Sequence, residues 1–197
     1  MENSETFKLI EGTDLNVEFK DIFELEYIQK LQTLFSDAFG VSSLVTDVNG
    51  KAITKTYNYC TLCRDIVRKS TQGMHDCGVM ERLLSKHHNE GPLIRECENT
   101  GLWEAGVNIM VGGKLIGSWI IGQVQSDYKY DSQIKDLSKK LGVNQEEYTL
   151  ALYDIPIMPM KTFENIANML YTYINDIANN RYSILQLKKY ISDKVGK

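Results

Sequence analysis

The four cysteines are the residues whose spacing most strongly suggests chemistry. Cys60 and Cys63 form a C-x-x-C motif, and Cys77 and Cys97 follow singly. Two thiolates separated by two residues can reach one ion, so this spacing is typical of zinc and iron–sulfur sites. A second C-x-x-C pair would complete such a site, and the sequence has none. Three interpretations stay open: a metal site on all four cysteines, buried packing of small thiols, or redox chemistry.

Other catalytic constellations are absent from the sequence. It contains neither a glycine-rich phosphate loop before a helix nor a G-x-S-x-G elbow. The C-x-x-C pair is not placed between a strand and a helix of a βαβ unit, as a thioredoxin-like role requires. We therefore expect that this protein is not an enzyme.

The composition of the chain limits which classes of protein it can belong to. The chain has 197 residues, of which 43% are hydrophobic, which is enough for one domain with an appendage. Its net charge of −4 is spread without long blocks of one sign, which argues against a nucleic-acid-binding surface. No apolar stretch approaches the roughly 20 residues of a membrane helix, and the N-terminus lacks an export signal. We expect a cytoplasmic chain with no membrane contact, whose cysteines are reduced.

Hydrophobic periodicity and turn residues predict the elements. An amphipathic helix over 22–39 ends at Gly40, and Gly50 turns a first hairpin of 41–46 and 51–55. The remaining predicted elements are helices over 60–70 and 74–88, punctuated by Gly73 and Gly91, a strand over 93–97, a hairpin of 103–111 and 114–125, helices over 132–141 and 145–152, and a long helix from 161. Strands and helices do not alternate regularly, so we predict an α+β fold with an antiparallel sheet and flanking helices.

The segment Leu115–Val124 is apolar on both alternations, which is typical of a central strand. Gly117 and Gly122 interrupt it. Glycine inside a strand marks a close approach to the backbone, so a side chain or a ligand is expected at both positions.

The last helix carries a heptad seam. Its core positions are spaced alternately by four and three residues: Ile166, Leu170, Tyr173, Ile177, Asn180, Ile184, Leu187 and Ile191. Isoleucine and leucine in this alternation favour parallel two-stranded coils. We expect the part over 163–174 to pack on its own domain and the part beyond Asn180 to contact a second copy. The helix reads as a connector to a downstream output domain.

Several segments, taken in order, carry a family resemblance. They are Leu31-Gln-Thr-Leu-Phe-Ser-Asp-Ala-Phe39, Val45-Thr-Asp-Val-Asn-Gly50, Ile53-Thr54, Tyr59-Cys-Thr-Leu-Cys-Arg64, Gly73-Met-His-Asp-Cys77, Cys97-Glu-Asn-Thr-Gly-Leu102, Ile109-Met-Val-Gly-Gly-Lys-Leu-Ile-Gly117 and Gly122-Gln-Val124. Over this half of the chain the sequence resembles the PocR sensory-domain family. It departs from the family pattern at Asn108, where a proline is expected, so ligand identity is not carried across.

The resemblance implies a PAS- or GAF-like sensor of the kind found at the front of transcription regulators, histidine kinases and cyclic-nucleotide signalling enzymes. It implies a small metabolite as ligand, with short diols and other small hydrocarbon derivatives as the suggested class. It also implies that the cysteines form a site near the pocket, where zinc or an iron–sulfur cluster would be the cofactor. A metal- or redox-sensing module is the alternative function.

A sensory pocket needs apolar walls and a few polar groups. Tyr59, Trp103 and Trp119 are the candidate walls, and Asn108 and Gln123 are the candidate hydrogen-bonding groups; either tryptophan could equally be ordinary core. We divide the chain into an N-terminal arm (1–20), a sensory domain (21–160) and a connector helix (161–197). Ligand binding is expected to shift the first and last helices, and thereby the pairing of two chains in a homodimer.

Overall fold

A four-stranded antiparallel sheet forms the centre of the protein. The computed structural model describes residues 15–88, 91–155 and 157–195. Within them the strands are β1 (Ser42–Thr46), β2 (Leu93–Glu96), β3 (Trp103–Val111) and β4 (Lys114–Val124), in the order β1-β4-β3-β2. The predicted α+β fold is confirmed, with β4 as a central strand.

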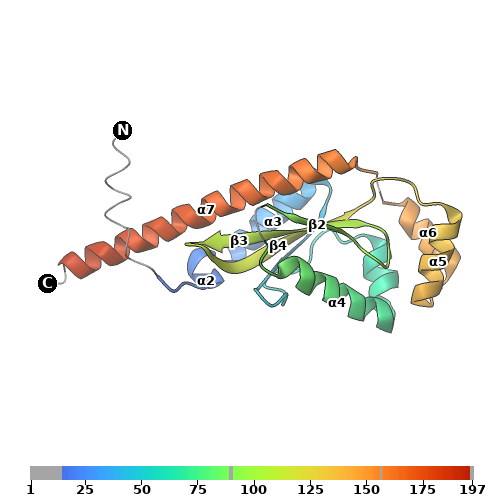
Figure 1. Cartoon of the computed structure of the whole chain (residues 1–197), viewed down its shortest axis with the longest axis horizontal. Helices are drawn as coiled ribbons and strands as arrows, with labels where there is room; N and C mark the ends of the chain where they lie inside the picture. The colour runs from blue at the N-terminus through green and yellow to red at the C-terminus, as the bar shows by residue number, and fades with distance from the viewer. Residues whose placement is uncertain (1–14, 89–90, 156, 196–197) are drawn as a thin grey trace.

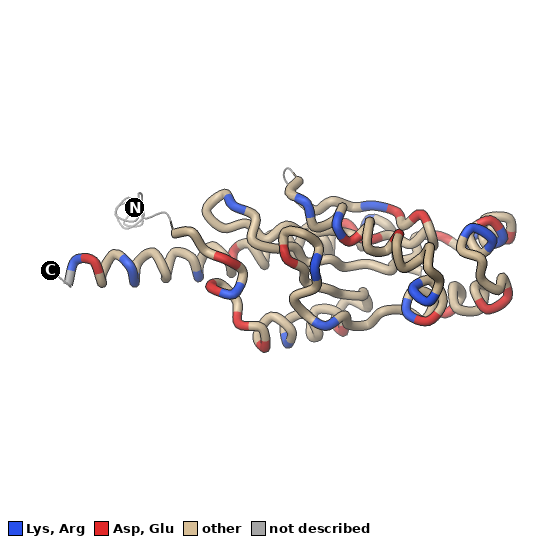
Figure 2. Tube along the Cα trace, turned by 90° about the horizontal axis from the view of Figure 1, so that it is seen from below, with Lys and Arg blue, Asp and Glu red and all other residues tan. Residues whose placement is uncertain are grey.

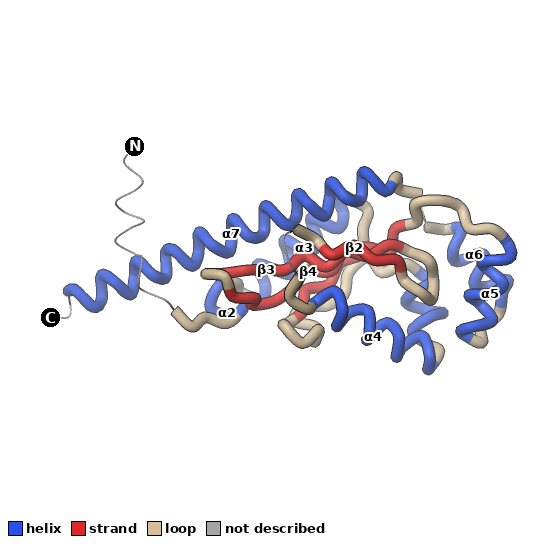
Figure 3. Tube along the Cα trace, in the orientation of Figure 1, coloured by secondary structure: helices blue, strands red, loops and turns tan. Residues whose placement is uncertain are grey.

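Helices cover both faces of this sheet (Figures 1 and 3). They are α2 (Phe19–Ile22), α3 (Leu25–Phe39), α4 (Thr71–Ser85), α5 (Asp131–Leu141), α6 (Gln145–Tyr153) and α7 (Met160–Val195). Helices α3 and α7 pack on one face and α4 packs on the other, while α5 and α6 lie together at one end of the molecule. Acidic and basic residues are interspersed along the chain (Figure 2).

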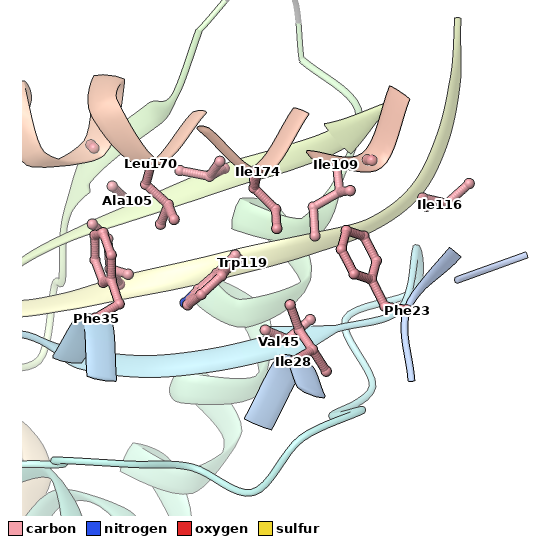
Figure 4. Packing of buried hydrophobic residues seen from close by; sticks show 14 of the residues in the cluster. Phe23, Ile28, Phe35, Val45, Ala105, Ile109, Ile116, Trp119, Leu170 and Ile174 are labelled. Carbon is pink, nitrogen blue, oxygen red and sulfur yellow. The ribbon is translucent and has the colours of Figure 1, made fainter. Parts of the chain in front are cut away.

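The face under α3 and α7 is apolar. Trp119 of β4 is fully buried there and contacts Phe35 of α3, with ring centroids 5.6 Å apart (Figure 4). Leu170 and Ile174 of α7 close the same core from the other side. The indole Nε1 of Trp119 donates to Ser43 Oγ at 2.6 Å, so its one polar atom is satisfied. We call this side the apolar face.

The opposite face, under α4, is lined by small and polar residues, and we call it the polar face. Thr46 and Ser85 share a hydrogen bond of 2.7 Å between their hydroxyls, and Ser118 Oγ donates to the Ser85 carbonyl at 3.1 Å. A Cβ atom at Gly106 would lie 2.1 Å from the carbonyl oxygen of Leu84. The absence of a side chain at Gly106 therefore lets the C-terminal end of α4 lie directly on the strand.

The two glycines of β4 mark close approaches, as predicted. A Cβ atom at Gly117 would lie 2.8 Å from the Thr46 carbonyl oxygen and 2.9 Å from the Phe19 ring. A Cβ atom at Gly122 would lie 2.7 Å from the Cα atom of Glu104. In both cases the neighbour is part of the protein itself.

The first predicted hairpin is only half correct. Gly50 adopts a φ of 82° in the turn, but 51–55 forms no strand and meets β1 through one isolated bridge, between Ala52 and Thr46. The reason is a side chain that replaces the backbone ladder, because Thr54 Oγ1 accepts a hydrogen bond from Val45 N. The Val45 carbonyl meanwhile accepts from both Ile53 N and Thr54 N, which breaks the regular register.

Two predicted helices also need correction. The segment 22–39 is interrupted at Phe23, where the backbone is extended between α2 and α3. The segment 60–70 contains a π-helical turn, η1 (Leu62–Ile66), followed by a 3₁₀ turn, η2 (Val67–Lys69). Gly73 lies inside the first turn of α4 because Ser70 Oγ caps the helix by accepting from Gly73 N at 3.0 Å.

Helix α7 changes its surroundings along its length. Phe163, Leu170, Ile174 and Tyr182 are buried against the sheet and α2, so its first half packs on the domain as expected. Farther along, the heptad residues are exposed: Ile184 at 53%, Leu187 at 41% and Ile191 at 50%. Of the predicted N-terminal arm, 1–14 lies outside the described residues, and Val17 and Phe19 are buried in the core.

Two asparagines of α7 bind the edge of β3. Strand β2 pairs with β3 only as far as Gly106, which leaves the next part of β3 without a strand partner on that side. Asn175 Oδ1 accepts from Met110 N at 2.7 Å, and Asn175 Nδ2 donates to the Asn108 carbonyl at 2.9 Å. Asn179 Nδ2 donates to the Met110 carbonyl at 3.1 Å. These amides satisfy backbone groups that a longer β2 would otherwise pair.

Candidate functional site

A small cavity lies on the polar face, between the sheet, the η1–η2 segment and α4. The space open to the centre of a water molecule is about 10 Å³, which is room for about one water. We call it the central cavity. Its lining residues are Ser42, Tyr59, Cys63, Val67, Arg68, Cys77, Met80, Glu81, Cys97, Thr100, Glu104, Ile120 and Gln123.

An ion pair lies at the wall of the central cavity. The Arg68 guanidinium from η2 pairs with the Glu81 carboxylate from α4, and both side chains are largely buried. The guanidinium also lies over the Tyr59 ring, 5.0 Å from its centroid. Burial alone would lower the pKa of Arg68, but neighbouring Tyr59 and Glu81 raise it, so the charge is retained. Its Nε atom is buried without a hydrogen-bond partner among the described residues.

Glu104 brings a second carboxyl group to the cavity. It lies near the start of β3, at a shift in register with β4. No hydrogen bond to its carboxyl group is made by the residues that the structure describes. Burial, and then the nearby Glu81 carboxylate, raise the pKa of Glu104 to about 7, although Arg68 opposes the shift. A carboxyl group in a cavity whose pKa is shifted by burial and by a neighbouring charge is a candidate functional residue.

The four cysteines gather around the cavity. Cys63, Cys77 and Cys97 line it, and Cys60 is half-buried beside Cys63. Burial raises the pKa of Cys77 to about 12 and also raises that of Cys97, so both are neutral thiols. A hydrogen bond from the Cys63 thiol lowers the pKa of Cys60. Within 15–88, 91–155 and 157–195, no group of three His, Cys, Asp or Glu side chains has the geometry of a metal site. Zinc or an iron–sulfur cluster at the cysteines stays a prediction.

Two of the five predicted pocket residues line the central cavity. Gln123 has a φ of 56°, a left-handed conformation unusual for a residue other than glycine. Its Oε1 atom accepts a hydrogen bond from Cys60 N at 2.7 Å, which fastens the cysteine-bearing loop to β4. Burial raises the pKa of Tyr59 well above its usual value, so this phenol stays protonated.

The other three predicted residues lie elsewhere. Trp119 is in the core of the apolar face, and Trp103 borders an open hollow near Ser126. Asn108 is on the polar face, but its amide is already used. Its Oδ1 accepts from His88 N at 3.0 Å, and its Nδ2 donates to the Lys86 carbonyl and to Ser118 Oγ. A ligand-binding role for these three residues stays a prediction.

The sequence did not identify the charged residues of the cavity as site residues, and the position of Glu104 at the end of a predicted strand favoured a solvated carboxylate. Arg68, Glu81 and Glu104 come from three separate elements, and no short motif links them. A signal was available for Glu104, which is in phase with Gly106 and Asn108 along β3 and therefore shares their face. A charged residue on an inward-facing position of a strand covered by a helix needs a partner or a function.

Two other hollows are relevant. A groove of about 140 Å³ runs beside α4 and shares Met80 and Cys97 with the central cavity. We call it the α4 groove. A wider hollow of about 490 Å³ lies between α2 and the strand turns, and it includes Val17, Val48 and Leu115.

Comparison with known proteins places this arrangement in a family. The model of the sensory domain found in PocR matches residues 21–182, which is most of the chain. The chain belongs to the PocR sensory-domain family. It is also 26% identical over 102 residues to the regulatory protein PocR of Salmonella typhimurium (strain LT2). That match covers 51% of this chain and 33% of the relative, so the chain matches about a third of the relative's length. No solved structure matches the chain.

The family match and the resemblance noted above agree, and the chain is a sensory domain of the type found in a regulatory protein. Among the described residues, no helix combines the length and apolar character needed to cross a membrane.

Proposed function

We propose that this PocR-family domain is a non-catalytic sensor that binds a small metabolite in the central cavity. The class implied by the resemblance is a short diol or another small hydrocarbon derivative. The observation that carries the proposal is that two polar groups of one cavity lack hydrogen-bond partners among the described residues: Arg68 Nε, which is buried, and the carboxyl group of the partly buried Glu104. Buried polar groups are normally paired, so a ligand that pairs with both gains free energy on binding.

The cavity must expand to hold such a ligand, and its walls favour this. One wall consists of a π-helical turn followed by a 3₁₀ turn, and irregular helical segments of this kind recur at functional sites. Another wall is Met80, whose unbranched side chain adopts many conformations. A sensor requires that ligand binding favour one arrangement over another, and expansion of a nearly closed cavity provides that difference.

The proposed relay runs through β3 to α7. Glu104 faces the cavity from β3, and the same strand is hydrogen-bonded to Asn175 and Asn179 of α7 farther along. A displacement of β3 on ligand binding would therefore change how α7 sits on the sheet. Because α7 continues beyond the sheet, such a change reaches the exposed part of the helix.

We further propose that the exposed part of α7 pairs with α7 of a second copy. The exposed side chains of Ile184, Leu187 and Ile191 keep the heptad spacing. Among the described residues, no other element packs over this part of α7. Two parallel helices bury such a stripe against each other, which gives the homodimer expected from the seam.

The ligand proposal is tested by thermal unfolding of the purified domain against a panel of small diols, alcohols and amines. A ligand that binds only the folded state raises Tm in a concentration-dependent way. Cys77→Leu places extra volume in the cavity and is expected to abolish the shift. His75→Leu, on the exposed side of the same helix, is the matched control and should keep it. An unchanged response in Cys77→Leu would refute binding in this cavity.

The dimer proposal is tested by sedimentation. The double variant Ile184→Lys, Leu187→Lys is expected to convert a dimer to a monomer, because it places charges in the seam. The double variant Ser192→Lys, Asp193→Lys adds lysines to exposed positions outside the stripe and should remain dimeric. A wild-type protein that sediments as a monomer at all concentrations would refute the pairing.

A redox-sensing role is the second candidate, favoured by the hydrogen bond between the Cys63 and Cys60 thiols. Treatment with oxidised glutathione would then join Cys60 and Cys63 in a disulfide, with two reduced glutathione molecules released. Intact mass would show the loss of two hydrogen atoms in the wild type and not in Cys63→Ser. A wild-type mass that stays unchanged would exclude this second candidate.

A further inference from the structure

The charges around the central cavity do not balance. Glu81 and Glu104 contribute two carboxyl groups, and Arg68 is the one basic side chain that lines the cavity among the described residues. Arg68 is committed to Glu81, with which it forms the ion pair. Glu104 has no cationic partner of its own, and the thiols and the Tyr59 phenol beside it bring no positive charge. A buried carboxylate of this kind is stabilised by a ligand that carries a positive charge.

The α4 groove continues the same electrostatic character toward the surface. It is bordered by Asp76 and Glu98, along with the apolar side chains of Val79 and Leu83. Asp76 accepts hydrogen bonds from Gln72 and His75, and exposed Glu98 lies near Lys140. The path to the cavity therefore carries carboxylates at its surface, which attract cations more than anions.

Met80 and Cys97 line both the groove and the cavity, and Met80 is the longer and more flexible of the two side chains. It is half-buried on α4, and the flexible thioether side chain can change its rotamer with little strain. With Met80 turned aside, the space of about 10 Å³ in the cavity joins the 140 Å³ of the groove. The joined space accommodates a molecule of a few heavy atoms.

We propose that the ligand of this domain is a small hydroxylated amine, bound as its ammonium form with the cation at Glu104 and the hydroxyl group at Arg68. This inference rests on the proposed sensory function and specifies the chemistry of the same site. An ammonium group donates hydrogen bonds and has no acceptor, which suits the unpaired Glu104 carboxylate. A hydroxyl oxygen accepts a hydrogen bond and suits the unpaired Arg68 Nε.

Neutral and anionic ligands of the same size fit less well. A diol offers a hydroxyl group to Arg68 but leaves the charge of Glu104 uncompensated. A hydroxy acid brings a further carboxylate next to Glu81 and Glu104, where like charges repel. The three classes therefore rank as hydroxylated amine, diol and hydroxy acid, in order of decreasing affinity.

The experiment measures the affinity of the whole 197-residue chain for three compounds that share a three-carbon skeleton, 1-amino-2-propanol, propane-1,2-diol and lactate. Titration calorimetry at neutral pH is expected to give a Kd for the amine at least about tenfold below that of the diol. No binding of lactate is expected. The variant Glu104→Gln keeps the shape of the side chain and removes its charge, so the preference for the amine should fall to about threefold or less.

A matched control removes a carboxylate that is not in the cavity. Glu98→Gln, at the exposed end of the groove with 89% of its side chain accessible, should keep most of the preference for the amine. Circular dichroism verifies the fold of each variant. If Glu104→Gln fails to fold, Glu104→Ser serves instead, because it also removes the charge and should lower the preference for the amine in the same way.

The outcomes separate this inference from the proposed function. A diol that binds as well as or better than the amine overturns the cationic ligand and leaves the sensory function standing. Equal loss of both ligands in Glu104→Gln also overturns it, because the residue would then act without regard to charge. Absence of binding for all three compounds, together with a broad panel that gives no Tm shift, overturns both.

Discussion

The two faces of the sheet are built by neighbouring residues of the same strands, yet they differ in almost every respect. On β4, Trp119 points into a close-packed apolar core, while Ser118 and Ile120 point toward α4 and the cavity. The apolar face is sealed by α3 and α7, and the polar face is held by hydrogen bonds to α4 and encloses two glutamates and an arginine. The first face supplies rigidity and the second supplies groups that a ligand can satisfy.

The difference between the two faces indicates how a small domain can couple ligand binding to a helix that does not contact the ligand. Strand β3 contributes residues to both faces, with Glu104 on the cavity side and Val107 and Ile109 in the core under α7. A close-packed core has few voids and low compressibility, so a displacement of one element moves the elements packed against it. The proposed signal therefore passes from the adaptable face to the rigid one through a shared strand.

The largest effect is expected from the apolar face. Trp119→Ala removes a fully buried indole and leaves Ser43 Oγ without its donor, so the free energy of unfolding should fall by about 3–5 kcal/mol. Ile120→Ala on the cavity side should lower it by about 2 kcal/mol, because the surroundings are less tightly packed. Urea denaturation measures both. Equal losses at the two positions would contradict the contrast between the faces.

The next effect concerns the contact between α4 and the sheet. In Gly106→Ala the new methyl group would lie 2.1 Å from the Leu84 carbonyl oxygen, and backbone cannot give way as a side chain can. We expect a loss of about 2–3 kcal/mol in urea denaturation, together with weaker ligand binding as α4 moves off the cavity. A variant as stable as the wild type would show that α4 is not held in this position.

A smaller effect is expected at the junction of β3 and α7. Asn175→Ala leaves Met110 N and the Asn108 carbonyl without their side-chain partners, which should lower the free energy of unfolding by about 1–2 kcal/mol. If the relay is correct, ligand binding persists while the ligand-induced change in hydrogen exchange along α7 disappears. Asn168→Ala, at an exposed position of the same helix, is the control. Unaltered coupling in Asn175→Ala would remove this junction from the relay.

The smallest effect is expected for Glu104→Gln, which should raise the free energy of unfolding in a way that depends on pH. Because the folded state raises the pKa of Glu104 from 4.5 to about 7, the folded protein holds this proton more tightly than the unfolded chain. Stability therefore falls as pH rises from below 4.5 to above about 7. Glu104→Gln should stabilise the protein by about 1 kcal/mol near pH 8, with about 3 kcal/mol as an upper limit, and not near pH 4. The same gain at both pH values would contradict a buried ionisable carboxyl group here.

Strong local patterns allowed much of the fold to be predicted. The hairpin of β3 and β4 has a continuously apolar second strand and a Gly112-Gly113 turn, and the structure confirms it. The hairpin around Gly50 was only half correct, since Thr54 replaces a backbone hydrogen bond with its hydroxyl group. Whether a side-chain hydroxyl replaces a backbone hydrogen bond depends on the tertiary structure around it. The alternation of apolar and polar residues in the sequence therefore does not reveal it.

The site was harder to predict than the fold. The cysteines drew attention because their spacing is a motif, and the structure brings three of them to the cavity wall. No motif in the sequence links Arg68 with Glu81, because their meeting depends on how η2 packs against α4. The two tryptophans were predicted as possible pocket walls, but a large aromatic side chain is equally suited to the wall of a pocket and to a hydrophobic core.

The most direct test of the account is the position at which a small polar ligand contacts the protein. Heteronuclear NMR of the ¹⁵N-labelled domain, titrated with 1-amino-2-propanol and with propane-1,2-diol, locates that position. We predict that the amide signals of Arg68, Cys97 and Glu104 show the largest shifts, larger than those of α7. Shifts confined to Val17, Val48 and Leu115, which border the wider hollow beside α2, would contradict the central cavity as the sensory site.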